Sequence, residues 1–218
     1  MRKILFIAPH PDDETLGCGG AILKHKNNGD QIHWLVVTSF IGNNEASQKY
    51  MRQIELVRQG YGFLGFKNLG FHPAFLDREP LSNLIKEIGE YILENSIEIL
   101  YVPFRNDAHS DHQMVFDASI ACSKTFRFPS VRSIRVYETL SETNFNLKPD
   151  GIGFRPNLYI DISEFTEKKL EILRYYESEI GAHPFPRSEE CVEALFRLRG
   201  SEAGVLAAEG FMVLKEIQ

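Results

Sequence analysis

Cysteine, tryptophan and long apolar runs are all scarce in this chain of 218 residues. Its three cysteines, Cys18, Cys122 and Cys191, lie far apart and form no Cys-x-x-Cys pattern, so neither a disulfide framework nor a structural zinc cluster is expected. We expect reduced thiols and a cytoplasmic protein. No stretch approaches the ~18 apolar residues of a membrane span, and the apolar run at residues 3–8 is too short for a signal peptide.

Basic residues are also in the minority. The chain has 24 Lys and Arg against 30 Asp and Glu, a formal net charge of −6, which gives no electrostatic reason to expect nucleic acid or an anionic membrane as a partner. Nucleic acid and anionic membranes are therefore not the expected partners. The length and the hydrophobic fraction of 43% are typical of a single globular domain, here residues 1–218. A homo-oligomer is compatible with the sequence, which does not fix the number of copies.

Short apolar runs of the kind found in buried strands alternate with longer segments of helical period. The expected strands cover residues 3–8, 31–38, 68–71, 98–102, 133–138, 157–161 and 211–214. The expected helices cover residues 14–28, 44–64, 82–95 and 111–126, and two more begin at Ser163 and Ser188. This alternation predicts an α/β, Rossmann-like fold, with a mainly parallel sheet and helices on both faces. In the common strand order 3-2-1-4-5-6, the first and fourth strands are neighbours and ligands bind at their carboxyl ends.

Two clusters of His and Asp follow the first and fourth expected strands. Residues 9–14 read Pro-His-Pro-Asp-Asp-Glu, and residues 106–112 read Asn-Asp-Ala-His-Ser-Asp-His. Because neighbouring strand ends bring the clusters together, His10 and Asp13 can offer an imidazole and a carboxylate to one ion, and a histidine of the second cluster completes a three-ligand site. Three protein ligands with an open fourth position are typical of catalytic zinc.

The remaining polar side chains of the two clusters suit hydrolysis by a water activated at a metal. Asp12 is not needed as a ligand and is placed to act as general base. One of His109 and His112 can bind the metal, while the other, if protonated, stabilises an oxyanion and protonates a leaving amine. Asp111, between them, can orient an imidazole ring. This set favours metal-assisted hydrolysis of an acyl bond.

Both motifs resemble those of the PIG-L/LmbE family of zinc-dependent N-acetylglucosaminyl deacetylases, whose fold is Rossmann-like. The family's first motif, Ala or Pro before His-Pro-Asp-Asp-Glu, matches residues 9–14, and its second, His-x-Asp-His, matches residues 109–112. The resemblance implies an enzyme that removes acetyl from an N-acetylated amino sugar of the N-acetylglucosamine type, free or conjugated, and releases acetate and a free amine. It also implies one Zn²⁺ per chain, while metal affinities alone leave Fe²⁺ or Co²⁺ open.

The resemblance assigns a role to each matching residue. Its metal ligands would be His10, Asp13 and His112. Asp12 would be the general base. His109 would polarise the acyl carbonyl and protonate the amine.

Weaker likenesses concern the substrate and the surroundings of the metal. Arg52 resembles an Arg that reaches toward the sugar from an Arg-x-x-Glu helix, and Asp77 resembles an Asp that binds a sugar hydroxyl. A surface ion pair and a simple turn account for these two residues equally well. Glu14 and Asp111 would support the site. The chain departs from the mycothiol-pathway members at Asp107, where they carry a Tyr that assists the oxyanion. This departure bears on the fine mechanism and on the thiol-cofactor substrates, and not on the metal.

Two other functions use the same residues. Two His and one carboxylate also describe non-haem iron oxygenases, although the parallel α/β pattern argues against them by analogy. A non-catalytic sugar-binding paralogue would keep the fold, but it would have no chemical need to keep Asp12 and His109.

Overall fold

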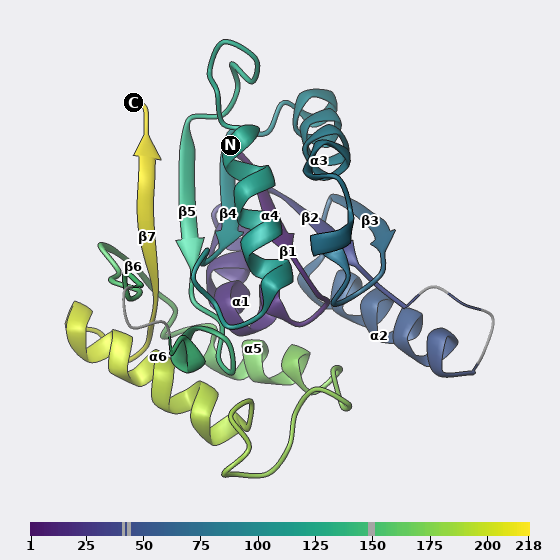
Figure 1. The fold of residues 1–218 in the computed structure, drawn as a ribbon. Helices are drawn as coiled ribbons and strands as arrows, with labels where there is room; N and C mark the ends of the chain where they lie inside the picture. Colours follow the sequence, from purple (N-terminus) through teal and green to yellow (C-terminus); the bar gives the residue numbers. More distant parts are fainter. Residues whose placement is uncertain (41, 43–44, 148–150) are drawn as a thin grey trace.

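One seven-stranded sheet organises the protein (Figure 1), in a computed structural model that describes all residues except 41, 43–44 and 148–150. The strands are β1 (Lys3–Ala8), β2 (Gln31–Thr38), β3 (Gly65–Phe71), β4 (Ile99–Pro103), β5 (Ser133–Tyr137), β6 (Leu158–Asp161) and β7 (Ala208–Glu216). The helices are α1 (Asp13–Asn27), α2 (Glu45–Tyr61), α3 (Leu81–Asn95), α4 (Ser110–Ala121), α5 (Thr166–Leu173) and α6 (Glu189–Ala203), with short 3-10 turns η1 (Leu76–Arg78) and η2 (Thr143–Phe145). The α/β, mainly parallel, Rossmann-like class is confirmed.

The strand order is β3-β2-β1-β4-β5-β7-β6. The first five strands pair in parallel, whereas β7 pairs antiparallel with both β5 and β6. The expected order therefore holds through the fifth strand and is wrong after it, because the last strand of the chain inserts between β5 and β6. As predicted, β1 and β4 are neighbours.

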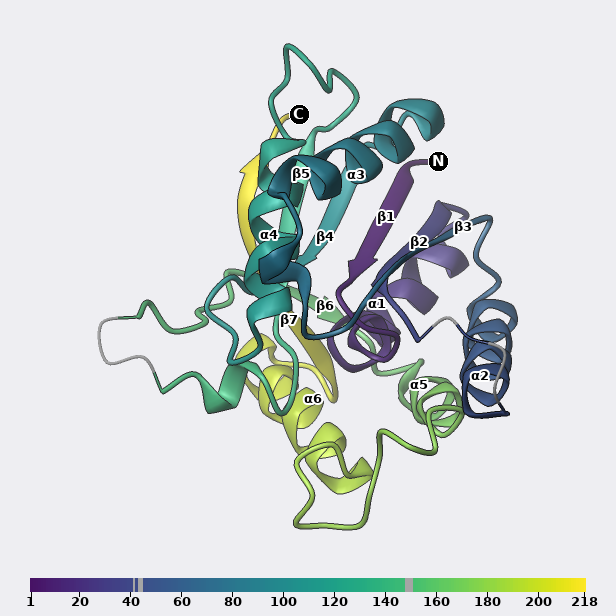
Figure 2. The ribbon, with the colours of Figure 1, turned by 45° about the vertical axis from the view of Figure 1, so that its right-hand side comes forward.

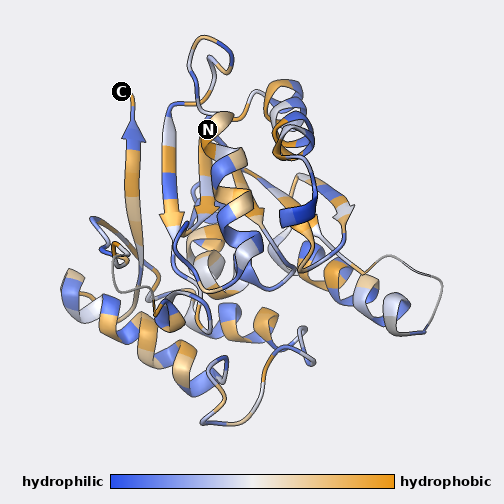
Figure 3. Cartoon of the chain, in the orientation of Figure 1, coloured by the Kyte–Doolittle hydropathy of each residue, from blue (hydrophilic) through white to orange (hydrophobic). Residues whose placement is uncertain are grey.

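Helices cover both faces of the sheet, as the sequence predicted (Figure 2). Successive residues of a strand point to opposite faces. In β1, Leu5 and Ile7 pack in the core cluster that α3 and α4 cover. Ile4 and Phe6 pack in a second cluster, which α1, α2 and α5 cover. Burial on both faces explains the almost unbroken apolar sequence of the central strands, visible in Figure 3.

Several element ends differ from the expected ones. The second helix was expected to run to residue 64, but α2 ends at Tyr61 because Gly62 takes a left-handed conformation (φ +68°). The third strand begins earlier than expected, at Gly65. Helix α4 ends at Ala121, five residues early, and α5 begins at Thr166 rather than Ser163. Ser188 does cap α6, as its hydroxyl accepts a hydrogen bond from the Cys191 amide.

Two glycines let α1 lie close against its neighbours. A Cβ atom at Gly17 would be 2.7 Å from the carbonyl oxygen of Glu138, and one at Gly20 would be 2.5 Å from Cγ2 of Ile162. Since real Cβ atoms do not approach so closely, any larger residue would push the helix outward. The amino end of α1, with Asp13 as its first residue, is thereby held at the carboxyl ends of β1 and β4. In the described part of the chain, no helix has both the length and the apolarity to cross a bilayer.

Candidate active site

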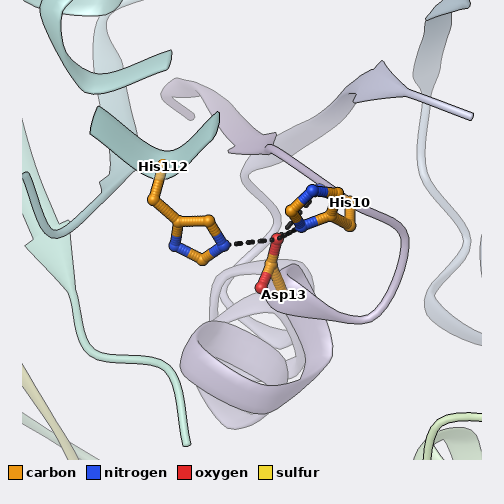
Figure 4. Close-up of side chains that lie close together, drawn as sticks. All are labelled: His10, Asp13 and His112. Atoms are coloured by element: carbon orange, nitrogen blue, oxygen red, sulfur yellow. Dashed lines mark hydrogen bonds and ion pairs between the residues drawn. The ribbon is translucent and has the colours of Figure 1, made fainter. Parts of the chain in front are cut away.

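The three predicted metal ligands converge at the carboxyl ends of β1 and β4 (Figure 4). His10 follows β1, Asp13 is the first residue of α1, and His112 is the third residue of α4. Oδ2 of Asp13 lies between the two rings, 3.3 Å from Nδ1 of His10 and 3.3 Å from Nε2 of His112. One donor atom from each residue lies within 4.8 Å of the others. This spacing suits a small divalent cation.

The turn that presents these groups is strained at one residue. Asp12 has a φ of 130°, where side chains are rarely found, and it is buried. Its carbonyl oxygen accepts hydrogen bonds from the Thr15 and Leu16 amides at the start of α1, and its own amide donates to Oε2 of Glu14. The strained backbone directs Asp12 and Asp13 to different places, so two neighbouring carboxylates are available for two different tasks.

The electrostatics of the three groups favour positive charge between them. In the absence of a cation, burial opposes charging of His10, but its hydrogen bonds to Asp111 and Asp13 outweigh burial and raise its pKa to about 9. The pKa of buried His112 is likewise raised by Asp13 and Asp107, against its burial. Burial would raise the pKa of Asp13, but the two imidazoles lower it. The two imidazoles thus bind protons at the place where a metal ion would bind in their stead.

One atom in this group has no partner of its own. Nε2 of His112 is buried and makes no hydrogen bond within the described residues, although Asp13 is near. A buried polar atom without a partner costs free energy unless a ligand satisfies it. Imidazole nitrogen and carboxylate oxygen are donors that zinc accepts readily. The residues present therefore fit a divalent metal such as zinc.

Two further carboxylates fix the imidazole rings. Oδ2 of Asp107 lies 2.7 Å from Nδ1 of His112, and its Oδ1 accepts a hydrogen bond from the Thr143 hydroxyl. Oδ2 of Asp111 lies 3.0 Å from Nε2 of His10 and also accepts from the Ala74 amide. Such partners hold a ring in the orientation and tautomer that a metal requires. Asp111 was predicted to orient a ring, whereas Asp107 was noted only as a departure from relatives.

Asp107→Asn is expected to weaken zinc binding by about 10- to 100-fold, because the neutral amide no longer increases the basicity of His112. Competition with a chelator of known affinity would measure the change. Asp117→Asn is a matched control, since Asp117 is a carboxylate of α4, the helix that carries His112, and pairs with Arg105 outside the cavity. Equal zinc affinity of Asp107→Asn and the unmodified protein would contradict the role given to Asp107.

Asp12 has a cationic partner from the far end of the chain. Nη1 of Arg187 donates to its Oδ2 at 3.0 Å, and Nη2 of Arg187 lies 3.4 Å from Glu179. Burial and the charge of Asp13 raise the pKa of Asp12, while Arg187 opposes the shift. A carboxylate whose pKa is raised is a stronger base and so is better matched to accepting a proton from water. No local pattern links residues 12 and 187, so sequence reasoning missed this contact.

Glu14 supports the turn from inside the protein. Its Oε1 accepts hydrogen bonds from the hydroxyls of Thr15 and Tyr176, and its Oε2 accepts from the Asp12 amide. Burial raises its pKa to about 7. These contacts tie Glu14 to the turn, and its supporting role stays a prediction.

His109 lies at the open side of the cluster, with its ring 4.5 Å from that of His10. It caps α4, since its Nδ1 accepts a hydrogen bond from the Asp111 amide at 3.1 Å. Burial and the charge of His10 lower its pKa. The neutral ring therefore carries its proton on Nε2, from which it can donate.

A cavity of about 260 Å³ opens over these residues. Its lining includes His10, Asp12, Asp13 and His109, together with Phe40, Tyr50, Pro73, Glu142, Glu179 and Arg187. The predicted sugar-binding residues Arg52 and Asp77 are both exposed and are not part of this lining. Their role in binding substrate stays a prediction.

The fold and the cavity define an α/β protein with a polar ligand site at the switch point of its sheet. The family model of PIG-L, described as GlcNAc-PI de-N-acetylase, matches residues 5–123, which include both motifs. The chain therefore belongs to the PIG-L family.

The individual relatives share only a small part of their sequence with this chain. The diacetylchitobiose deacetylase of Thermococcus kodakarensis is 26% identical over 225 aligned residues, covering 96% of this chain and 82% of the relative. The solved structure of the conserved protein TT1542 from Thermus thermophilus aligns with a TM-score of 0.80 at 22% identity, over 100% of this chain and 97% of that one. GalB, a 4-carboxy-2-hydroxymuconate hydratase from Pseudomonas putida KT2440, aligns with a TM-score of 0.74 at 14% identity, over 100% and 98%. Such structural likeness shows the fold and does not by itself fix the reaction.

Proposed function

We propose that the protein is a zinc-dependent N-deacetylase, which hydrolyses the acetyl amide of an N-acetylated amino sugar and releases acetate and a free amine. The observation that carries this proposal is the convergence of His10, Asp13 and His112 in a PIG-L family chain, beside a cavity that His10, Asp12 and Asp13 line. The relative from Thermococcus kodakarensis, named a diacetylchitobiose deacetylase, supports the same class of substrate.

His10, Asp13 and His112 would hold the zinc ion. When bound, zinc supplies Lewis-acid chemistry, since it lowers the pKa of water and withdraws electron density from a carbonyl oxygen. Asp13 and His112 are buried and exclude other water from their side of the site, and Asp107 and Asp111 keep both rings in place. The open side faces the cavity, where an acetamido group can enter.

Asp12 takes a proton from the attacking water, whose oxygen then bonds to the acyl carbon. The contact with Arg187 holds the accepting carboxylate in position. His109 donates a hydrogen bond from its Nε2–H to the acyl oxygen, which gains negative charge as the water adds, and keeps its proton. When the carbon–nitrogen bond breaks, the nitrogen needs one proton to leave as an amine. Asp12, which has just gained a proton, gives it to this nitrogen. The neutral His109 cannot do so, because its one N–H stays in the hydrogen bond to the acyl oxygen.

Acetate release tests this function. Zinc-reconstituted protein is expected to release acetate and an equal amount of free amine from N-acetylglucosamine or N,N'-diacetylchitobiose. Oxygen uptake with a 2-oxo acid would instead support the iron-oxygenase alternative. If the protein binds zinc and sugar but releases no acetate from any N-acetylated sugar, the non-catalytic alternative replaces the proposal.

A further inference from the structure

Two carboxylates at the mouth of the cavity have no part in the proposed hydrolysis. Glu142 and Glu179 line the cavity together with Asp12 and Asp13. Glu142, just before η2, accepts a hydrogen bond from the Ser141 hydroxyl and forms no ion pair with any described residue. The charge of Glu142 interacts electrostatically with His109, and the charge of Glu179 interacts in the same way with Asp12. The negative charge of the cavity thus extends from its floor to its mouth.

The positive side chain that lines the same cavity is already paired with carboxylates. Arg187 is the one Arg or Lys among the described lining residues, and its guanidinium faces Asp12 and Glu179. A zinc ion at the floor would bring two positive charges, so the four lining carboxylates still outweigh the cations. The amino end of α1, which could attract an anion, carries Asp13 and Glu14 in its first turn.

The neighbouring space offers no better place for an anion. A second cavity of about 380 Å³ shares Phe40, Tyr50 and Glu179 with the first, so a substrate larger than one sugar can extend into it. Its lining cation, Lys49, forms an ion pair with Glu177 at 3.2 Å. Protein sites for phosphate ordinarily present Arg or Lys side chains free to bind it. Within the described residues, each Arg or Lys that lines these cavities, Arg187 and Lys49, already faces a carboxylate.

We propose that Glu142 and Glu179 are specificity-determining residues, which accept hydrogen bonds from the hydroxyls of an uncharged N-acetylated saccharide and repel sugars that carry phosphate. The proposal rests on the proposed deacetylation and narrows its substrate class. A hydroxyl donates a short, strong hydrogen bond to a carboxylate, whereas a phosphate offers only negative charge to it. Nucleotide-linked and phosphate-linked sugars are therefore poor substrates.

The test compares N-acetylglucosamine with N-acetylglucosamine 1-phosphate on the zinc-loaded protein. At low salt, kcat/KM for acetate release is expected to be at least about tenfold higher for the uncharged sugar, and the ratio should fall as salt screens the carboxylates. Glu142→Gln and Glu179→Gln should each lower the ratio several-fold, and Glu142→Lys should lower it further. Glu193→Gln is the matched control, because it makes the same change in net charge on α6, where Glu193 pairs with Arg197.

Equal or faster turnover of the phosphate would overturn the proposal, and an unchanged ratio in both Gln variants would remove the role of Glu142 and Glu179. If neither sugar yields acetate, the proposed deacetylation of these sugars is contradicted, and the selectivity proposal has to be tested by binding. Calorimetric titration of the zinc-loaded protein with the two sugars then decides the selectivity. Tighter binding of the uncharged sugar supports it, and tighter binding of the phosphate contradicts it.

Discussion

Asp13→Asn is expected to leave the protein without zinc and to reduce acetate release by about 10³-fold or more, as the loss of several kcal/mol of metal stabilisation requires. The change keeps the shape of the side chain and removes its charge. Oδ2 of Asp13 is the atom that both imidazoles approach, at 3.3 Å each. Without the carboxylate, two neutral nitrogens and an amide oxygen hold a divalent cation poorly. Metal analysis after dialysis, with turnover in the same samples, measures both effects.

Asp30→Asn is a matched control for that experiment. Asp30 is also a buried carboxylate that faces a histidine, since its Oδ2 lies 2.9 Å from Nδ1 of His25, and it also pairs with Arg2. Its contacts lie outside the cavity. The control should keep zinc even if its stability falls. Retention of one zinc per chain by Asp13→Asn would mean that the metal lies elsewhere.

The elements that were predicted well are those whose signal is local. Strands β1 and β2 begin and end at the expected residues, because an apolar run buried on both faces has clear ends. The convergence of the two motifs was also predictable, since parallel strands that are neighbours in the sheet have their carboxyl ends at one edge. The sequence of the motifs then indicated a metal, because His and Asp at these strand ends form one donor set.

What could not be predicted depends on distant contacts. The antiparallel β7 pairs with β5 and β6 through backbone groups, which leave no mark on its local sequence. Arg187 meets Asp12 only because the segment before α6 folds back over the strand ends. Asp107 was visible as an acid five residues before His112, but only its 2.7 Å contact distinguishes an orienting carboxylate from a solvated one. Local patterns identified the donors, and the tertiary fold supplied their partners.

The structure separates the roles of two adjacent carboxylates. Two imidazoles lower the pKa of Asp13, against the effect of burial, and so keep it charged. Burial and the nearby charge of Asp13 raise the pKa of Asp12. Environments that push two pKa values apart are typical of sites where one carboxylate is a fixed charge and the other exchanges protons. The strained backbone at Asp12 points the two neighbouring side chains to different places, so each can have its own surroundings.

Asp12→Asn is therefore expected to keep one zinc per chain and to lower kcat by about 10²- to 10⁴-fold, the usual contribution of a general base. The amide oxygen of Asn can still accept the hydrogen bond from Arg187, so the site should keep its shape, but the side chain can no longer take a proton from water. Metal analysis, kcat and KM measured together separate this effect from that of Asp13→Asn, which loses the metal as well. A KM close to that of the unmodified protein would show that sugar binding is intact. If kcat were unchanged, the proton would have to go to a group other than Asp12, and His109 would not be that group, because its Nδ1 already accepts the Asp111 amide and its Nε2 carries a proton.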